Sequence, residues 1–146
     1  MAADTWRDET LAALSGAGFR IGGARRAVVD LLSRQECCLS AQQIFDRLRE
    51  EGRPVGVASV YRVLELLDSL GRVQRVEVGS GTALYEPAHV DGEHHHHIVC
   101  DDCGTVQAFD DPELEGALLE AQERLGYARG THDLVVRGSC GDCRDA

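Results

Sequence analysis

The chain has 146 residues, a size that allows one ordinary domain or two small ones, and 43% of them are hydrophobic, which is enough for a globular core. The first residues, MAADTWRDE, carry neither the basic stretch nor the apolar stretch of a signal peptide. No apolar run reaches membrane-spanning length. We therefore expect a soluble cytoplasmic protein with no membrane partner.

The net charge of −10 is unevenly distributed along the chain. Residues 1–80 contain 11 acidic residues and 11 arginines, whereas residues 81–146 contain 14 acidic residues and 4 arginines. A neutral first part can present a local basic face to nucleic acid, while an acidic second part repels phosphate and attracts cations. The asymmetry predicts two parts with different functions.

Four helices are expected in the first part. The first three are predicted over residues 5–14, over residues 25–33 and after the N-cap Ser40. In the fourth, VASVYRVLELLDSLG, apolar residues recur at helical spacing, Tyr61 among them. The opposite face of this helix carries Ser59 and Arg62.

Two short runs rich in β-forming residues, VQRVEV and TALYE, follow these helices and predict a hairpin. Helices followed by a hairpin are typical of a winged helix, whose last helix offers small and basic residues to the major groove. A small helical bundle without a role in nucleic-acid binding is the alternative that the same pattern allows.

A smaller α/β unit is expected beyond the linker PAHVDGE. Strands are predicted over residues 94–99, 106–109 and 132–136. A helix between the last two strands is predicted to begin near Asp111, with Pro112 in its first turn. The whole chain is therefore predicted to be of the α+β class.

Two Cys-x-x-Cys pairs lie in this second part, Cys100 with Cys103 and Cys140 with Cys143. A gap of two residues lets both sulfurs of a pair reach one ion at about 2.3 Å, so two pairs can complete a tetrahedral zinc site. Such a site leaves no open position and is structural. Two redox-active dithiols are the alternative, although a second pair would be redundant for redox chemistry.

Four consecutive histidines precede the first cysteine pair. On a strand, side chains alternate between faces, so His94 and His96 would lie on one face and His95 and His97 on the other. The run therefore predicts two half-sites, each of which needs further ligands suited to zinc, iron or similar ions. Candidates are Glu86, His89, Cys38, Glu115 and His132. An incidental polar strand is the alternative.

The order of the motifs VASVYRVLELLDSLG, HHHHIVCDDCG and THDLVVRGSCGDC resembles the ferric uptake regulator family of bacterial metal-sensing repressors. The resemblance extends from about Gly18 to Cys143. It implies an N-terminal winged helix, a C-terminal dimerisation domain and metal-dependent binding to operator DNA.

The resemblance also implies roles for individual residues. Cys100, Cys103, Cys140 and Cys143 match the structural zinc site, and His94, His96, Glu115 and His132 match a second site. Glu86, His95 and His97 match members of the regulatory site at the hinge between domains. Tyr61 and Arg62 match the DNA-contacting pair of the recognition helix, and Arg25 matches a basic residue near the second helix.

Several positions depart from the family pattern. Ala24 replaces a common proline, and Ala108 stands where peroxide-sensing members have an aspartate ligand, which argues against peroxide sensing. Cys38 stands where many iron sensors have histidine, and His89 lies near a cysteine of zinc sensors. The all-histidine run favours zinc, whereas Glu86 is more typical of iron sensors. We expect His89, rather than Cys38, to complete the regulatory site.

We therefore predict a homodimeric, metal-dependent transcriptional repressor and not an enzyme. The predicted domains are a winged helix over residues 1–87 and a dimerisation domain over residues 88–146. The expected partners are double-stranded operator DNA and a second copy of the chain. The expected ions are a structural Zn²⁺ and a regulatory Zn²⁺, with Fe²⁺ as the alternative. Two other classes are a hydrolytic zinc enzyme, for which no positioned general base is evident, and a metal buffer that does not bind DNA.

Overall fold

The computed structural model describes residues 2–35, 37–79, 81–88 and 95–146. The chain divides into two compact units, Met1–Val90 (unit 1) and Asp91–Ala146 (unit 2). Among the described residues, no helix is both long enough and apolar enough to cross a membrane.

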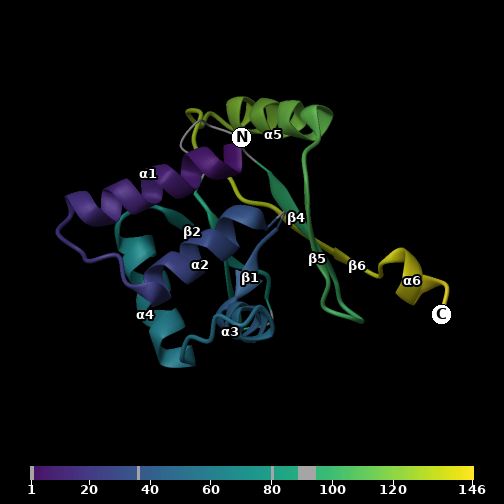
Figure 1. The fold of residues 1–146 in the computed structure, drawn as a ribbon. Coiled ribbons are helices and arrows are strands. Elements are labelled where there is room, and N and C mark those ends of the chain that lie inside the picture. Colours follow the sequence, from purple (N-terminus) through teal and green to yellow (C-terminus); the bar gives the residue numbers. More distant parts are fainter. Residues whose placement is uncertain (1, 36, 80, 89–94) are drawn as a thin grey trace. The chain divides into compact units, whose positions relative to one another are not determined.

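Unit 1 consists of four helices and a small antiparallel sheet. The helices are α1 (Ala2–Gly16), α2 (Gly23–Arg34), α3 (Ala41–Glu50) and α4 (Val57–Ser69), and α1 runs alongside α2 (Figure 1). The strands β1 (Leu39–Ser40), β2 (Val73–Glu77) and β3 (Ala83–Pro87) form a sheet in the order β1-β3-β2. The β2–β3 hairpin confirms the predicted wing, and the order of the elements is that of a winged helix.

A continuous apolar core joins the four helices of unit 1. The largest fully buried apolar side chains are those of Leu14, Leu31, Leu32, Ile44, Leu48, Leu64 and Leu67. Ser40 is the N-cap of α3, as the sequence predicted, and it forms a capping box with Gln43. The Ser40 hydroxyl accepts from the Gln43 amide at 3.1 Å, and the Ser40 amide donates to the Gln43 side chain at 2.9 Å. Core packing and capping therefore hold the helices of the winged helix in place.

The assignment of Tyr61 to the apolar face of α4 is wrong. The buried stripe consists of Val60, Val63, Leu64 and Leu67, which follow the spacing i, i+3, i+4 and i+7. Tyr61 lies at the edge of this stripe and is 49% exposed. Its aromatic ring is therefore available to a partner of unit 1.

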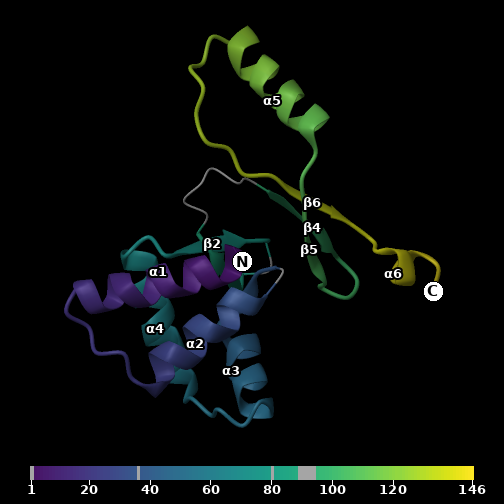
Figure 2. The ribbon, with the colours of Figure 1, turned by 45° about the horizontal axis from the view of Figure 1, so that its top comes forward.

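Unit 2 is a three-stranded sheet with one long helix. The strands β4 (His96–Cys100), β5 (Val106–Phe109) and β6 (Val135–Gly138) lie in the order β5-β4-β6, with β5 antiparallel and β6 parallel to β4. Figure 2 shows α5 (Pro112–Arg124) following β5, a long connection leading back to β6, and the short α6 (Gly141–Arg144) after it. The Asp111 side chain caps α5 by accepting from the amides of Glu113 and Leu114 at 3.0 and 3.2 Å.

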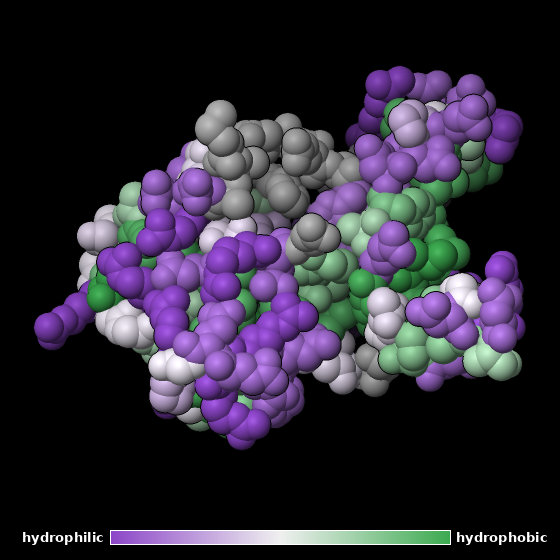
Figure 3. All heavy atoms as spheres, turned by 45° about the vertical axis from the view of Figure 1, so that its right-hand side comes forward, coloured by the Kyte–Doolittle hydropathy of each residue, from purple (hydrophilic) through white to green (hydrophobic). Residues whose placement is uncertain are grey.

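Apolar side chains of unit 2 remain exposed in the single chain. No residue of α5 is fully buried, and just beyond it Leu125 and Tyr127 are 71% and 70% exposed. Ile98 and Val136, which are paired in register across β4 and β6, are also exposed. Figure 3 shows a broad apolar area on the strands of this unit. An open area of this kind marks an interaction surface.

Candidate metal centres and nucleic-acid interface

The four cysteines of unit 2 lie together. The sulfur atoms of Cys100, Cys103, Cys140 and Cys143, here called the Cys₄ cluster, all lie within 4.8 Å of one another. The distance between Cys103 Sγ and Cys140 Sγ is 3.8 Å, which matches the spacing of about 3.8 Å for two sulfurs bound tetrahedrally to one zinc at about 2.3 Å. The cluster forms because parallel pairing of β4 and β6 brings the two Cys-x-x-Cys segments to the same end of the sheet.

The thiols of the Cys₄ cluster differ in acidity. The Cys140 amide donates to Cys100 Sγ at 3.3 Å, and this bond, with a second from the Cys103 amide, lowers the pKa of Cys100 to about 6. A hydrogen bond from the Thr105 hydroxyl lowers the pKa of Cys103, whereas the neighbouring thiols raise the pKa of Cys143 to about 12. Cys100 therefore forms a thiolate, which can attract a cation, more readily than Cys143.

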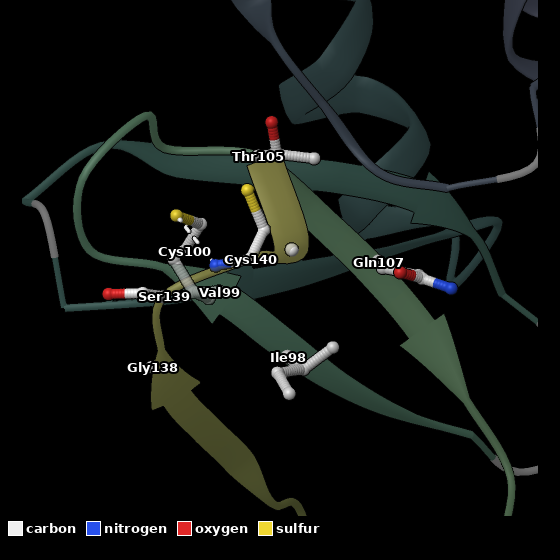
Figure 4. A pocket seen from close by; sticks show the side chains of 9 residues that line it. Ile98, Val99, Cys100, Thr105, Gln107, Gly138, Ser139 and Cys140 are labelled. Atoms are coloured by element: carbon white, nitrogen blue, oxygen red, sulfur yellow. Dashed lines mark hydrogen bonds between the residues drawn. The ribbon is translucent and has the colours of Figure 1, made fainter. Parts of the chain in front are cut away.

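A small hollow of about 180 Å³ adjoins the Cys₄ cluster (Figure 4). Its walls include Ile98, Gln107 and Gly138, together with Cys100 and Cys140. The side chains of Cys100 and Cys140 lie close together at one end of this hollow. Apolar side chains, polar side chains and backbone groups thus line the hollow beside Cys100 and Cys140.

The described histidines of the run lie on alternating faces, as predicted. The rings of His95 and His97 have their centroids 5.0 Å apart in an edge-on arrangement. His96, between them in sequence, instead contacts His132, with ring centroids 5.2 Å apart. His94 lies outside the described residues. The strand therefore presents two separate groups of imidazoles.

His96, Glu115 and His132, here called the His96 cluster, form the first of these groups. Their candidate ligand atoms lie within 4.8 Å of one another. His96 Nε2 hydrogen-bonds to Glu115 Oε1, and His132 Nε2 lies 3.0 Å from Glu115 Oε2. Helix α5 supplies the carboxylate, while β4 and the segment before β6 supply the rings. Two imidazoles and one carboxylate form a donor set that suits zinc and other divalent transition metals.

Candidate ligands of unit 1 lie where the edge strand β1 pairs with the central strand β3. Leu39 pairs with Tyr85, so the antiparallel register places Cys38 opposite Glu86. The neighbouring Cys37 thiol, burial and the Glu86 charge together hold the pKa of Cys38 above its usual range. Cys37 was not among the candidates from sequence, although the adjacent Cys-Cys pair was a visible signal. The other candidate from this region, His89, lies outside the described residues.

The predicted DNA-contacting residues Arg25, Ser59 and Arg62 line one hollow of about 300 Å³, together with Gly22 and Gly23. We call this the arginine pocket. Arg62 donates to the Ser59 hydroxyl at 3.1 Å, and the Arg25 guanidinium lies 5.5 Å from the centroid of the Phe19 ring. The N-terminus of α2 adjoins the same hollow, and Gly22 provides no side-chain cap for its amides. Two guanidinium groups beside a helix N-terminus form an environment that suits phosphate.

The sequence of the chain matches those of a known protein family. The profile of the ferric uptake regulator family matches residues 16–137. The chain is 38% identical over 135 residues to the ferric uptake regulation protein of Neisseria gonorrhoeae, covering 92% of each chain. It is 34% identical over 132 residues to the zinc uptake regulation protein of Mycobacterium tuberculosis, covering 90% of this chain and 99% of that protein.

A solved structure supports the same assignment. The ferric uptake regulator of Helicobacter pylori superimposes with a TM-score of 0.85 at 26% identity, covering 99% of this chain and 95% of that chain. The match thus includes both the winged helix and the unit that carries the Cys₄ cluster. The chain belongs to the ferric uptake regulator family.

Proposed function

We propose that this chain is a metal-dependent transcriptional repressor that binds operator DNA through unit 1 and metal ions through unit 2. The observation that carries the proposal is that one chain holds both an arginine pocket on a winged helix and separate clusters of metal-binding side chains. The relatives named above are regulation proteins, which supports a regulator rather than an enzyme. As a DNA-binding repressor, it would act in the cytoplasm.

The Cys₄ cluster is proposed to hold a structural Zn²⁺. All four positions of a tetrahedral ion would be filled by sulfur, so no position remains for a substrate or for exchange with a competing ligand. The spacing of 3.8 Å between Cys103 and Cys140 sulfurs supports this assignment. Zinc there would stabilise the end of the sheet in unit 2.

A second ion is proposed for the His96 cluster, with His94 as a further ligand implied by the resemblance. A third, the regulatory ion, is proposed to bind His95 and His97 on the opposite face of β4, with Glu86 as the ligand contributed by unit 1. The Helicobacter pylori regulator has three functional metal binding sites, which is the same number. Metal can favour the DNA-binding form only if that form binds the ion more tightly.

DNA binding is proposed to use α4 and the arginine pocket. Arg62 and Ser59 lie on the exposed face of α4, Tyr61 is exposed beside them, and Arg25 faces the same hollow. A homodimer is proposed to form through unit 2, because burial of the exposed Ile98 and Leu125 on a second copy would remove apolar surface from water. Two copies would present two recognition helices to two half-sites.

Operator binding under controlled metal tests the proposal. The protein would first be loaded with zinc at the Cys₄ cluster and then titrated with Zn²⁺ or Fe²⁺ in the presence of operator DNA. We expect Zn²⁺ to activate binding, with His95→Ala and His97→Ala abolishing activation while the Cys₄ zinc is retained. His132→Ala serves as the matched control, since it should remove a different ion. Activation by Fe²⁺ alone would reject zinc as the sensed ion. Operator binding that does not depend on added metal would reject the proposal of a metal-dependent repressor.

A further inference from the structure

Helix α1 packs along α2, but its polar side chains are connected to the segments on both sides of α4. Arg53 lies in the connection that leads into α4 at Val57, and Arg72 lies in the connection that follows Ser69 at the other end. A helix whose two flanking segments are both held has little freedom to shift or to rotate. Helix α1 can therefore act on the position of α4 from both of its ends.

The contact beyond the C-terminal end of α4 is made at Arg72. The Trp6 indole N–H donates to the Arg72 carbonyl at 3.0 Å, and Arg72 Nε donates to the Thr10 hydroxyl at 3.1 Å. Trp6 and Thr10 lie one helical turn apart and are both buried, so water competes little for these bonds. The Arg72 amide donates to the Leu67 carbonyl in the last turn of α4 at 2.8 Å. Arg72 thus ties α1 directly to this end of α4.

The same carbonyl also joins the base of the wing to α1. Besides the Trp6 indole, the Arg72 carbonyl accepts from the Ala88 amide at 3.0 Å. This bond extends the ladder of β2 and β3 beyond the pairing of Val73 with Pro87. The wing and the C-terminal end of α4 therefore share one point of attachment to α1.

The contact before α4 passes through Asp30 on α2. Arg7 Nε donates to Asp30 Oδ1 at 2.6 Å, and Arg53 Nη1 donates to Asp30 Oδ2 at 3.1 Å. The Asp30 side chain is partly buried, so salt screens these pairs less than it screens fully exposed ones. The Arg53 amide donates to the Leu48 carbonyl at 2.9 Å, which fixes the backbone of the same connection. Because Arg7 is next to Trp6 in the chain, a single turn of α1 serves both ends of α4.

We infer that α1 is a brace for α4, in which Trp6, Arg7 and Thr10 are positioning residues for operator recognition. The inference rests on the proposed function, because it takes α4 as the helix that reads DNA. Hydrogen bonds to base edges form only over a narrow range of distance and angle. Non-specific binding is electrostatic and independent of sequence. Loss of the brace should therefore weaken binding to the operator more than binding to other DNA.

Operator binding by a Thr10 variant of the full-length, metal-loaded protein tests the brace. Thr10→Val keeps the shape of the side chain and removes only the hydroxyl, and Trp6 fluorescence still reports whether unit 1 is folded. We expect the operator affinity to fall about fivefold to tenfold, while the affinity for non-specific DNA of the same length stays unchanged. Thr10→Ser keeps the hydroxyl and should restore most of the operator affinity.

A control of similar stability separates positioning from folding. Ile44 is fully buried in α3, so Ile44→Val destabilises unit 1 without removing a brace contact. Its ratio of operator affinity to non-specific affinity should equal that of the wild type. Arg7→Ala releases the other end of α4 and should lower this ratio as well. A ratio in Thr10→Val that is no lower than in Ile44→Val would overturn the inference.

Amide hydrogen exchange without DNA, measured by NMR, tests the two ends of the brace separately. Thr10→Val should speed the exchange of the Arg72 amide and leave that of the Arg53 amide at the rate found in Ile44→Val, because only one end opens locally. Arg7→Ala should give the reverse pattern. Equal changes at both amides in each variant would overturn the brace. A wild-type protein without preference for the operator would reject the proposed function, and the exchange rates would still decide whether α1 holds α4.

Discussion

Unit 1 and unit 2 are stabilised in different ways. Unit 1 buries a continuous set of apolar side chains, and burial of one leucine contributes about 1.5–3 kcal/mol. Among the described apolar residues of unit 2, only Val99 and Cys100 are buried, and α5 contributes no fully buried residue. A unit of this size without a substantial core needs additional stabilisation from metal or from a partner. The comparison teaches that unit 1 is stabilised by packing of its core, whereas unit 2 needs stabilisation from bound metal or from a partner.

Removal of a cysteine ligand should have the largest effect and should be confined to unit 2. Cys100→Ser is expected to abolish tightly held zinc and the dimer, because the free energy of metal binding is also the free energy that folds this unit. Metal analysis and sedimentation would measure both losses, while the fluorescence of Trp6, the only tryptophan in the chain, would report an intact unit 1. Ser139→Ala, beside Cys140, is the matched control. A zinc-free protein that remains dimeric at micromolar concentration would contradict the comparison.

A core substitution in α4 should produce the converse result. Leu64 is fully buried, so Leu64→Ala should destabilise unit 1 by about 2–5 kcal/mol through lost burial and the cavity left behind. Urea unfolding followed by Trp6 fluorescence would measure the change, and the zinc content should stay that of the wild type. Leu66→Ala on the same helix, where the side chain is only partly buried, should cost less. Loss of zinc with Leu64→Ala would show that the two units do not fold independently.

A change in the arginine pocket should leave the stability of both units intact and weaken only DNA binding. Arg62→Ala is expected to lower operator affinity by about 1–3 kcal/mol if the guanidinium contacts a base edge. If it contacts phosphate instead, the loss of affinity should be the same for all operators. The slope of log affinity against log salt concentration should then fall in magnitude by about one. Arg75→Ala on the wing, where Arg75 is paired with Glu77 at 3.4 Å, is the matched control. Unchanged operator affinity in Arg62→Ala would show that this face of α4 does not contact the major groove of the DNA.

The smallest expected effect is the pH-dependent contribution of Asp30 to the stability of unit 1. Partial burial raises the pKa of Asp30, but the hydrogen bonds from Arg7 and Arg53 and their positive charges together lower it by more, so the net shift of the pKa is downward. Because the folded-state pKa lies below the unfolded value of about 3.9, the Asp30 contribution is fully present above that pH and is lost as the pH falls through the folded-state value.

Asp30→Asn should therefore destabilise unit 1 at neutral pH by no more than about 1 kcal/mol, and the difference from the wild type should vanish in strong acid. Trp6 fluorescence during thermal unfolding at several pH values would measure it. Zinc should leave unit 2 at a higher pH than this, since the cysteine ligands must be thiolates. A difference between Asp30→Asn and the wild type that grows in acid would contradict the assigned sign.

The sequence predicted most of unit 1, because its elements follow from local patterns. The helices, the Ser40 cap and the wing each have a periodicity or a cap that can be read directly. Tyr61 was placed wrongly because the apolar stripe of α4 is narrow and a residue at its edge satisfies the same spacing as one inside it. The alternation of the histidines could be predicted because it depends only on strand geometry.

The candidate site was less predictable where residues meet through tertiary structure. The proximity of Glu115 to His96 and His132 was implied by the family resemblance and not by spacing, since α5 and the segment before β6 must fold back to bring them together. The adjacency of Cys38 and Glu86 depends on the register between β1 and β3, and a two-residue strand such as β1 leaves almost no sequence signal. The assignments of His89 and His94 remain predictions, because both lie outside the described residues.

The parallel pairing of β4 and β6 has a further consequence for how unit 2 reaches its correct alignment. Cys100 pairs with Gly138, so the two cysteine segments emerge level with each other. A slip of β6 by one residue would turn its side chains to the other face and displace Cys140 by about 3.3 Å along the strand. The four sulfurs could then no longer share one ion. A four-residue strand such as β6 specifies its own register weakly. A zinc ion in the Cys₄ cluster would stabilise only the correctly aligned sheet, because only that register brings the four sulfurs together.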